Sequence, residues 1–182
     1  YGGEPLLAFS KIQQCVTLAD QLMPDVHITY VITTNGILLD KYMSYLVEHH
    51  FHILISLDGN EKNNQYRVFK NGTESFNIVE KNINLLYVSY PVFFQENVNF
   101  STVLHGKSNC LDALNFFSKW NKTPFFSNVV ETGVKKNTKS YQEIFKMHEY
   151  STDEIIKMKT NYPNVYTSLF PMKSGQCYLW SK

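Results

Sequence analysis

The chain has 182 residues, of which 43% are hydrophobic and 18% are charged, so it holds enough apolar material for one sizeable core and too little for two. The formal charge of +1 comes from 17 basic and 16 acidic residues, and such a balance gives no long-range field that favours nucleic acid or an anionic membrane. No apolar run reaches the roughly 18 to 20 residues of a membrane span, and we find no secretory pattern ahead of the domain. We therefore expect one soluble, cytoplasmic domain with no nucleic-acid or membrane partner.

The first part of the chain alternates helical and strand patterns. Apolar residues at every third or fourth position predict an amphipathic helix over 7–23, which Pro24 ends. The segment 27–34 is dense in Ile, Val, Thr and Tyr, a composition typical of a buried strand. The same two patterns then recur, and they predict a helix over 38–48 and a strand over 51–57.

The second part begins with a polar stretch over 60–73 that shows no period, which predicts a long loop. Long loops in compact domains tend to be functional. The elements expected after it are a helix that Ser75 caps and Pro91 ends, a strand over 98–104, a helix over 110–120 and a strand over 125–130.

Strands that alternate with helices of ten or more residues predict an α/β domain with parallel strands joined by right-handed crossovers. These strands are rich in Val, Ile and Phe, so we expect a sheet covered on both faces, either a barrel or a doubly wound sheet.

Each predicted strand ends in a short polar group beside glycine. The groups are Thr34-Asn35-Gly36, Leu57-Asp58-Gly59, His105-Gly106 and Glu131-Thr132-Gly133, and Gly2-Gly3-Glu4-Pro5 has the same form before the first helix. One such corner is explained by turn preference alone. Because the carboxyl ends of parallel strands share one edge of a sheet, where α/β enzymes bind their ligands, five corners in order indicate a common site.

As a set, these corners resemble the radical S-adenosylmethionine (radical SAM) enzymes. The similarity is closest to the branch that includes peptide maturases and anaerobic sulfatase-maturating enzymes with SPASM-type auxiliary clusters. The motifs that carry it are Gly2-Gly3-Glu4-Pro5-Leu6-Leu7, Thr34-Asn35-Gly36-Ile37-Leu38-Leu39 and Ile55-Ser56-Leu57-Asp58-Gly59, followed by Arg67, Gly72 and Ser75-Phe76.

The resemblance implies a partial (β/α)6 TIM-like barrel that lacks its first strand and cluster loop. We expect the radical SAM core over 1–135, and the end of the barrel with a linker toward an auxiliary-cluster region over 136–182. In the family, a Cys-x3-Cys-x2-Cys loop binds a 4Fe-4S cluster, and thiolates are the ligands such clusters need. Cys15, Cys110 and Cys177 are too far apart to form that loop, so we expect its ligands upstream of a truncated chain.

The implied activity is reductive cleavage of S-adenosylmethionine to a deoxyadenosyl radical that modifies a peptide or protein. An electron donor such as a flavodoxin or ferredoxin is implied as a partner, and the chain alone is expected to be inactive. The alternative is a noncatalytic α/β domain that keeps only a cofactor- or peptide-binding scaffold.

Site residues follow from the same resemblance. Gly2, Gly3 and Glu4 match the turn that receives the cofactor's ammonium group, and charge-assisted hydrogen bonds suit a cation. Ser56 matches a serine that contacts the methionyl carboxylate or the ribose. Asn35 and Asp58 are expected on the same edge of the sheet.

Arg67 has two interpretations, a bidentate contact with the cofactor carboxylate or a salt bridge that holds the long loop. Asn63-Asn64 stand where the family commonly has His-Asp, so the contacts of this loop differ from the family pattern.

Cys177 is similarly placed to the first cysteine of an auxiliary cluster, against the alternative of a small buried hydrophobe. Cys15 and Cys110 fall on helix faces and are expected in the core. His105 and Glu131 could reach the same edge, although a solvated turn and a helix cap explain them as well.

Overall fold

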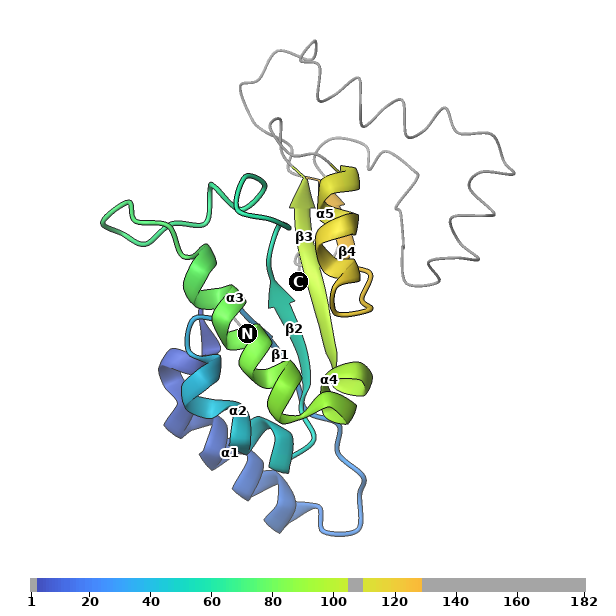
Figure 1. Ribbon diagram of the computed structural model, residues 1–182. Coiled ribbons are helices and arrows are strands. Elements are labelled where there is room, and N and C mark those ends of the chain that lie inside the picture. The colour runs from blue at the N-terminus through green and yellow to red at the C-terminus, as the bar shows by residue number, and fades with distance from the viewer. Residues whose placement is uncertain (1–2, 105–109, 129–182) are drawn as a thin grey trace.

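The computed structural model describes residues 3–104 and 110–128, which form a parallel sheet with helices between its strands (Figure 1). The sheet has four strands whose order in space follows the chain, and all neighbouring pairs are parallel. The strands are β1 (Val31–Thr34), β2 (His52–Ser56), β3 (Val98–Leu104) and β4 (Phe125–Asn128). The expected α/β class and parallel pairing are therefore confirmed for this part of the chain.

The helices connect one strand to the next. They are η1 (Pro5–Ala8), α1 (Phe9–Leu22), α2 (Leu39–Glu48), α3 (Phe76–Ser89), α4 (Pro91–Asn97) and α5 (Cys110–Ser118). Figure 1 shows α3 and α5 in front of the sheet. Right-handed crossovers between strands in chain order place successive helices on one face, whereas a doubly wound sheet reverses its order. No reversal occurs among the described strands, and closure into a barrel remains a prediction.

The helix side of the sheet holds the core. Alternate strand residues are buried there. An aromatic group from α4, β3 and the end of α5 packs among them. Its members Phe94, Phe100, Phe117 and Trp120 are all at most 2% exposed, and the Phe100 and Trp120 rings stack with centroids 5.4 Å apart. Burying rings of this size supplies much of the hydrophobic stabilisation of a small domain.

The opposite face of the sheet is only half covered in the described part. The alternating residues Thr33, Ser56, Asn99 and Ser101 are partly exposed on it. The same face also carries the apolar side chains of Val31, Leu54 and Val103, so it is mixed in character. Coverage of this second face, which a closed barrel would supply, stays a prediction.

Two local expectations also need correction. Pro91 begins α4 instead of only ending the preceding helix, because the first turn of a helix needs no N–H from its first residue. The strand predicted over 27–34 starts at Val31, the register partner of His52, where β2 begins. Before it, the Tyr30 carbonyl still accepts from the His52 N–H at 2.8 Å.

Cys15 is exposed, although its helix face was expected in the core. Helix α1 carries two apolar stripes and buries the one that contains Val16, while Leu18 on the other stripe stays 54% exposed. None of the described helices is both long and apolar enough to span a bilayer. The segment 136–182 lies outside the described residues.

Candidate functional site at the carboxyl ends of the strands

Glu4 joins the glycine corner before η1 to the end of β1. Its Oε1 accepts a hydrogen bond from the Leu6 backbone N–H at 3.1 Å, which caps the short helix. The same oxygen accepts from Thr34 Oγ1 at 2.8 Å, and Oε2 accepts from the Asn35 backbone N–H at 2.7 Å. Two corners that are 31 positions apart in the chain therefore meet at one carboxylate.

The turn after β1 is fixed from several sides. Gly36 has a φ of +81°, a left-handed conformation that favours glycine, and its N–H donates to Thr34 Oγ1 at 3.1 Å. Asn82 on α3 donates from Nδ2 to the carbonyls of Gly36 at 3.1 Å and Ile37 at 2.9 Å. A Cβ on Gly36 would lie 2.9 Å from Val79 Cγ1, so the turn packs directly against α3.

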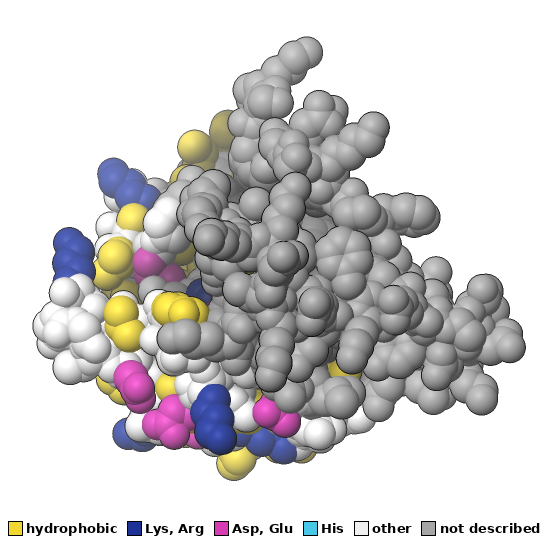
Figure 2. Space-filling model, turned by 90° about the horizontal axis from the view of Figure 1, so that it is seen from above, with side chains coloured by type: hydrophobic (Ala, Val, Ile, Leu, Met, Phe, Trp, Pro, Cys, Tyr) yellow, Lys and Arg dark blue, Asp and Glu magenta, His cyan; other side chains and the backbone are white. Residues whose placement is uncertain are grey.

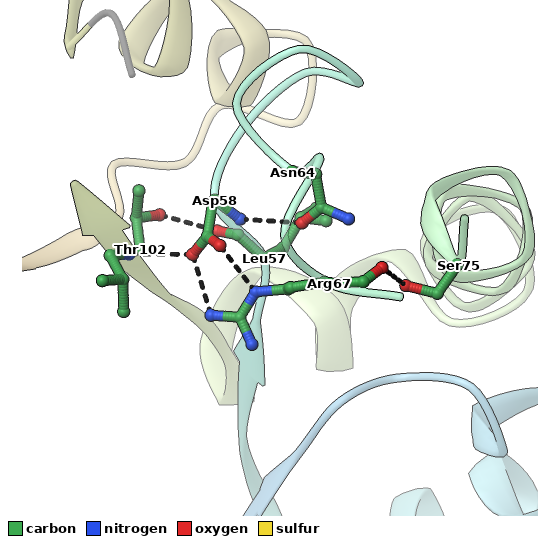
Figure 3. Close-up of polar contacts among 7 residues, drawn as sticks. Leu57, Asp58, Asn64, Arg67, Ser75 and Thr102 are labelled. Atoms are coloured by element: carbon green, nitrogen blue, oxygen red, sulfur yellow. Dashed lines mark hydrogen bonds and ion pairs between the residues drawn. The ribbon is translucent and has the colours of Figure 1, made fainter. Parts of the chain in front are cut away.

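The next corner is built around Asp58, which follows β2 and is 4% exposed. Arg67 donates to it twice, from Nε to Oδ2 and from Nη2 to Oδ1, both at 2.8 Å (Figure 3). Asp58 Oδ1 also accepts from the Val103 N–H at 2.9 Å, which ties the corner to β3. Of the two interpretations of Arg67, the described geometry contains the salt bridge that holds the loop.

The long loop 59–75 is anchored at both ends. Asn64 Oδ1 accepts from the Asp58 N–H at 3.2 Å, and Ser75 Oγ donates to the Arg67 carbonyl at 2.6 Å (Figure 3). Asn64 Nδ2 is buried, and within residues 3–104 and 110–128 it has no hydrogen-bond partner. The Asn63-Asn64 departure from the family pattern thus lies at a buried position beside Asp58, with Asn63 2% exposed.

Ser56 lies at the same level of the sheet as the first corner. It follows Ile55, which is the register partner of Thr34, and it pairs with Ser101 of β3. Its side chain alternates with buried Ile55 and therefore belongs to the half-exposed face.

The structure thus brings several of the predicted site residues to one edge. Glu4 and Asn35 are in direct contact, Ser56 lies on the adjacent strand end, and Asp58 with Arg67 forms the neighbouring corner. Thr34 was not among the predicted site residues, although it stood inside a quoted motif. In the sequence it stands directly before Asn-Gly as an ordinary β-branched strand residue, so nothing there marks its hydroxyl. The remaining candidates, Gly2, Cys177, His105 and Glu131, lie outside the described residues.

Figure 2 views the molecule from above, and both acidic and basic side chains lie on the described part of that face. Within the described ranges no group of three or more His, Cys, Asp or Glu side chains could hold a metal ion. The described residues therefore do not fit a 4Fe-4S cluster, whereas a carboxylate with nearby hydroxyl and amide groups suits a polar organic cation.

No family model matches the chain. Solved structures of anSMEcpe do match it: native anSMEcpe with bound AdoMet and Cp18Cys peptide has a TM-score of 0.66 and is 22% identical, covering 86% of this chain and 46% of that one. A histidine-tagged anSMEcpe with bound AdoMet has a TM-score of 0.68 at 21% identity, covering 91% and 45%. The chain shares the fold of part of anSMEcpe.

A curated relative matches over a shorter stretch. An uncharacterized protein of Methanocaldococcus jannaschii, MJ0907, is 37% identical over 75 residues, which is 41% of this chain and 26% of that protein. The chain spans a little under half of anSMEcpe and about a quarter of MJ0907. At these identities the likeness to anSMEcpe concerns the fold.

Proposed function

We propose that the full-length protein is a radical SAM enzyme, and that the described residues bind S-adenosylmethionine (AdoMet) at the carboxyl edge of the sheet. The observation that carries the proposal is the meeting of Glu4, Thr34 and Asn35 at one carboxylate. It occurs in a fold whose solved relative anSMEcpe, an anaerobic sulfatase-maturating enzyme, is seen with bound AdoMet.

The first corner suits the ammonium group of the cofactor. A carboxylate offers about four lone-pair sites, and Glu4 uses three of them for Leu6, Thr34 and Asn35. Counting the donors that the described residues supply, one site remains on Oε2 for a ligand N–H. In the proposal, Glu4 accepts one ammonium N–H there, and the backbone of Gly2 and Gly3 forms the rest of the turn.

The neighbouring strand ends suit the remaining polar groups of the cofactor. Ser56 is proposed to donate a hydrogen bond from its hydroxyl to the methionyl carboxylate or the ribose. Asn35 lines the same edge. Arg67 has five N–H donors and uses one on Nε and one on Nη2 for Asp58. About three donors remain, so Arg67 can hold Asp58 and still face a carboxylate of the cofactor.

The rest of the proposal concerns the whole protein. A 4Fe-4S cluster held by residues outside the described ranges would supply the electron for cleavage of AdoMet, with a flavodoxin or ferredoxin as its donor. The substrate is proposed to be a peptide or protein, because an anSMEcpe structure includes a Cp18Cys peptide. A closed barrel and an auxiliary-cluster role for Cys177 belong to the same proposal.

The test is equilibrium binding of AdoMet to anaerobically reconstituted full-length protein. We expect a brown, iron-containing protein that binds AdoMet and forms 5′-deoxyadenosine when reduced. Glu4→Gln should weaken binding at least tenfold, because it removes the charge that faces the ammonium group. The matched control is Glu61→Gln, at an exposed loop position, which should leave binding unchanged.

Two outcomes would contradict the proposal in different ways. Absence of AdoMet binding by wild-type protein contradicts it entirely. Binding of AdoMet without iron and without 5′-deoxyadenosine contradicts the enzyme and supports the noncatalytic binding domain.

A further inference from the structure

The Thr34 hydroxyl has a double role at the end of β1. It donates to Glu4 Oε1 at 2.8 Å and accepts from the Gly36 N–H at 3.1 Å, while the residue is only 2% exposed. A hydroxyl is one of the few side-chain groups that both donates and accepts. Thr34 thereby links the carboxylate of Glu4 to the turn that α3 holds in place.

We infer that Thr34 is a positioning residue that acts through Glu4 and aims the free acceptor site of Oε2 at the cofactor's ammonium group. This inference rests on the proposed function. It concerns a residue that is buried and touches the cofactor only indirectly, so its effect must pass through the orientation of the Glu4 carboxylate.

The geometry of the carboxylate supports this assignment. Oε1 is occupied by two donors, Leu6 N–H and Thr34 Oγ1, which approach from different elements. Fixing both donors on Oε1 restricts rotation of the carboxylate plane, and Asn35 N–H at 2.7 Å takes one of the two positions on Oε2. The direction of the remaining position is therefore set by the chain before any ligand binds, which lowers the entropy cost of binding.

Removing the backbone N–H of Leu6 or Asn35 would require proline, which also constrains the backbone. Thr34 is thus the one of the three donors that a side-chain substitution can delete. Thr34→Val keeps a β-branched side chain of similar size and loses both hydrogen bonds, whereas Thr34→Ser keeps the hydroxyl.

The experiment compares two ligands on cluster-containing, full-length protein: AdoMet and its desamino analogue, in which hydrogen replaces the ammonium group. Thr34→Val is expected to weaken AdoMet about tenfold and the analogue less than about twofold, since only AdoMet uses the aimed acceptor. Thr34→Ser should stay within about twofold of wild type for both ligands. Thr17→Val, at an exposed position of α1, is the matched control and should change neither.

A double-mutant cycle tests whether Thr34 acts through Glu4. In a Glu4→Gln background, Thr34→Val should no longer change the ratio of the two affinities, because the residue through which it acts is already altered. Circular dichroism and urea unfolding establish that each variant is folded. If Thr34→Val does not fold, Thr34→Cys takes its place, because a thiol is similar in size to the hydroxyl and a weaker donor. The ratio of its affinities for AdoMet and for the analogue is then compared with that of the wild type.

Equal weakening of both ligands would overturn the inference, since a general distortion of the site does not select for the ammonium group. An unchanged AdoMet affinity in folded Thr34→Val would overturn it as well, and both results leave the proposed function intact. Wild-type protein that binds neither ligand overturns the proposed function and the inference with it.

Discussion

Arg67 and Asp58 form a two-pronged ion pair in which both nitrogen–oxygen distances are 2.8 Å. The pair closes the first part of the long loop onto the end of β2. Since Asp58 also accepts from the Val103 N–H, one carboxylate connects the loop, β2 and β3. Planar, fork-like donors are well matched to such a contact.

Removing the Arg67 guanidinium should therefore destabilise the fold. Arg67→Met leaves a carboxylate that is 4% exposed without its counter-ion, and we expect a loss of about 2 to 3 kcal/mol of unfolding free energy. Lys70→Met, at an exposed position of the same loop, should cost less than about 0.5 kcal/mol. Urea unfolding of the full-length protein measures both, and equal small losses would show that Asp58 does not depend on the pair.

The tight packing of the first turn gives a second prediction. Gly36→Ala places a Cβ 2.9 Å from Val79 Cγ1 in a backbone of φ +81°, so it should cost about 3 kcal/mol. Gly72→Ala is a matched control, because Gly72 has φ +82° but no atom within 4 Å of the added Cβ. It should cost only about 1 kcal/mol. Similar losses in the two variants would mean that backbone strain alone, and not the contact with Val79, restricts position 36.

The buried aromatic group around Phe100 gives a third prediction. Phe100 is fully buried, stacks on Trp120 and lies 4.8 Å from the Phe117 ring centroid. Phe100→Ala should lower the free energy of unfolding by about 3 to 5 kcal/mol through lost contacts and a residual cavity. Val88→Ala, at a position that is 76% exposed, should change it by less than about 0.5 kcal/mol. Thermal and urea unfolding give both values, and a loss below that range for Phe100 would indicate that the core collapses into the space.

A fourth prediction concerns pH. Burial lowers the pKa of Lys122 from 10.5 to about 8, while its Nζ donates to the Gln95 carbonyl at 2.7 Å. Between those values the unfolded chain binds the proton more strongly than the folded one, so stability rises with pH across this window. Below about pH 8 both states are protonated and the cost of burying the charge is fully present.

The measurement compares wild type with Lys122→Met by urea unfolding from about pH 8 to about pH 10.5, the window that the two pKa values define. The wild type should gain stability relative to this variant as pH rises, since only the wild type is relieved of a buried charge. The same comparison with Lys70→Met should give a constant difference. A flat difference for Lys122→Met would indicate that its ammonium stays hydrated in the folded state.

Much of the fold follows from local patterns. The strand 98–104 and the start of the helix at Cys110 match the structure because alternation and helical spacing are set by neighbouring residues. The errors arise where one pattern allows two structures. Pro91 fits both the end of one helix and the start of another, and α1 offers two apolar stripes of which tertiary packing buries one.

The site was predictable at the level of the corners, because carboxyl ends of parallel strands share an edge. The contacts within it were not. Thr34 reads as an ordinary β-branched strand residue, and only the approach of Glu4 from a distant segment gives its hydroxyl a role. The choice between partners for Arg67 depended on the path of the loop, which has no period and therefore no signal in the sequence.

The order of the strands bears on how the molecule is assembled. Each described strand after β1 pairs with the strand that precedes it in the chain. We therefore expect the units to be able to fold one after another during synthesis, because no described pairing needs a later, distant strand. We expect a nascent chain that has emerged from the ribosome as far as Leu104 to protect β1, β2 and β3 already against amide hydrogen exchange.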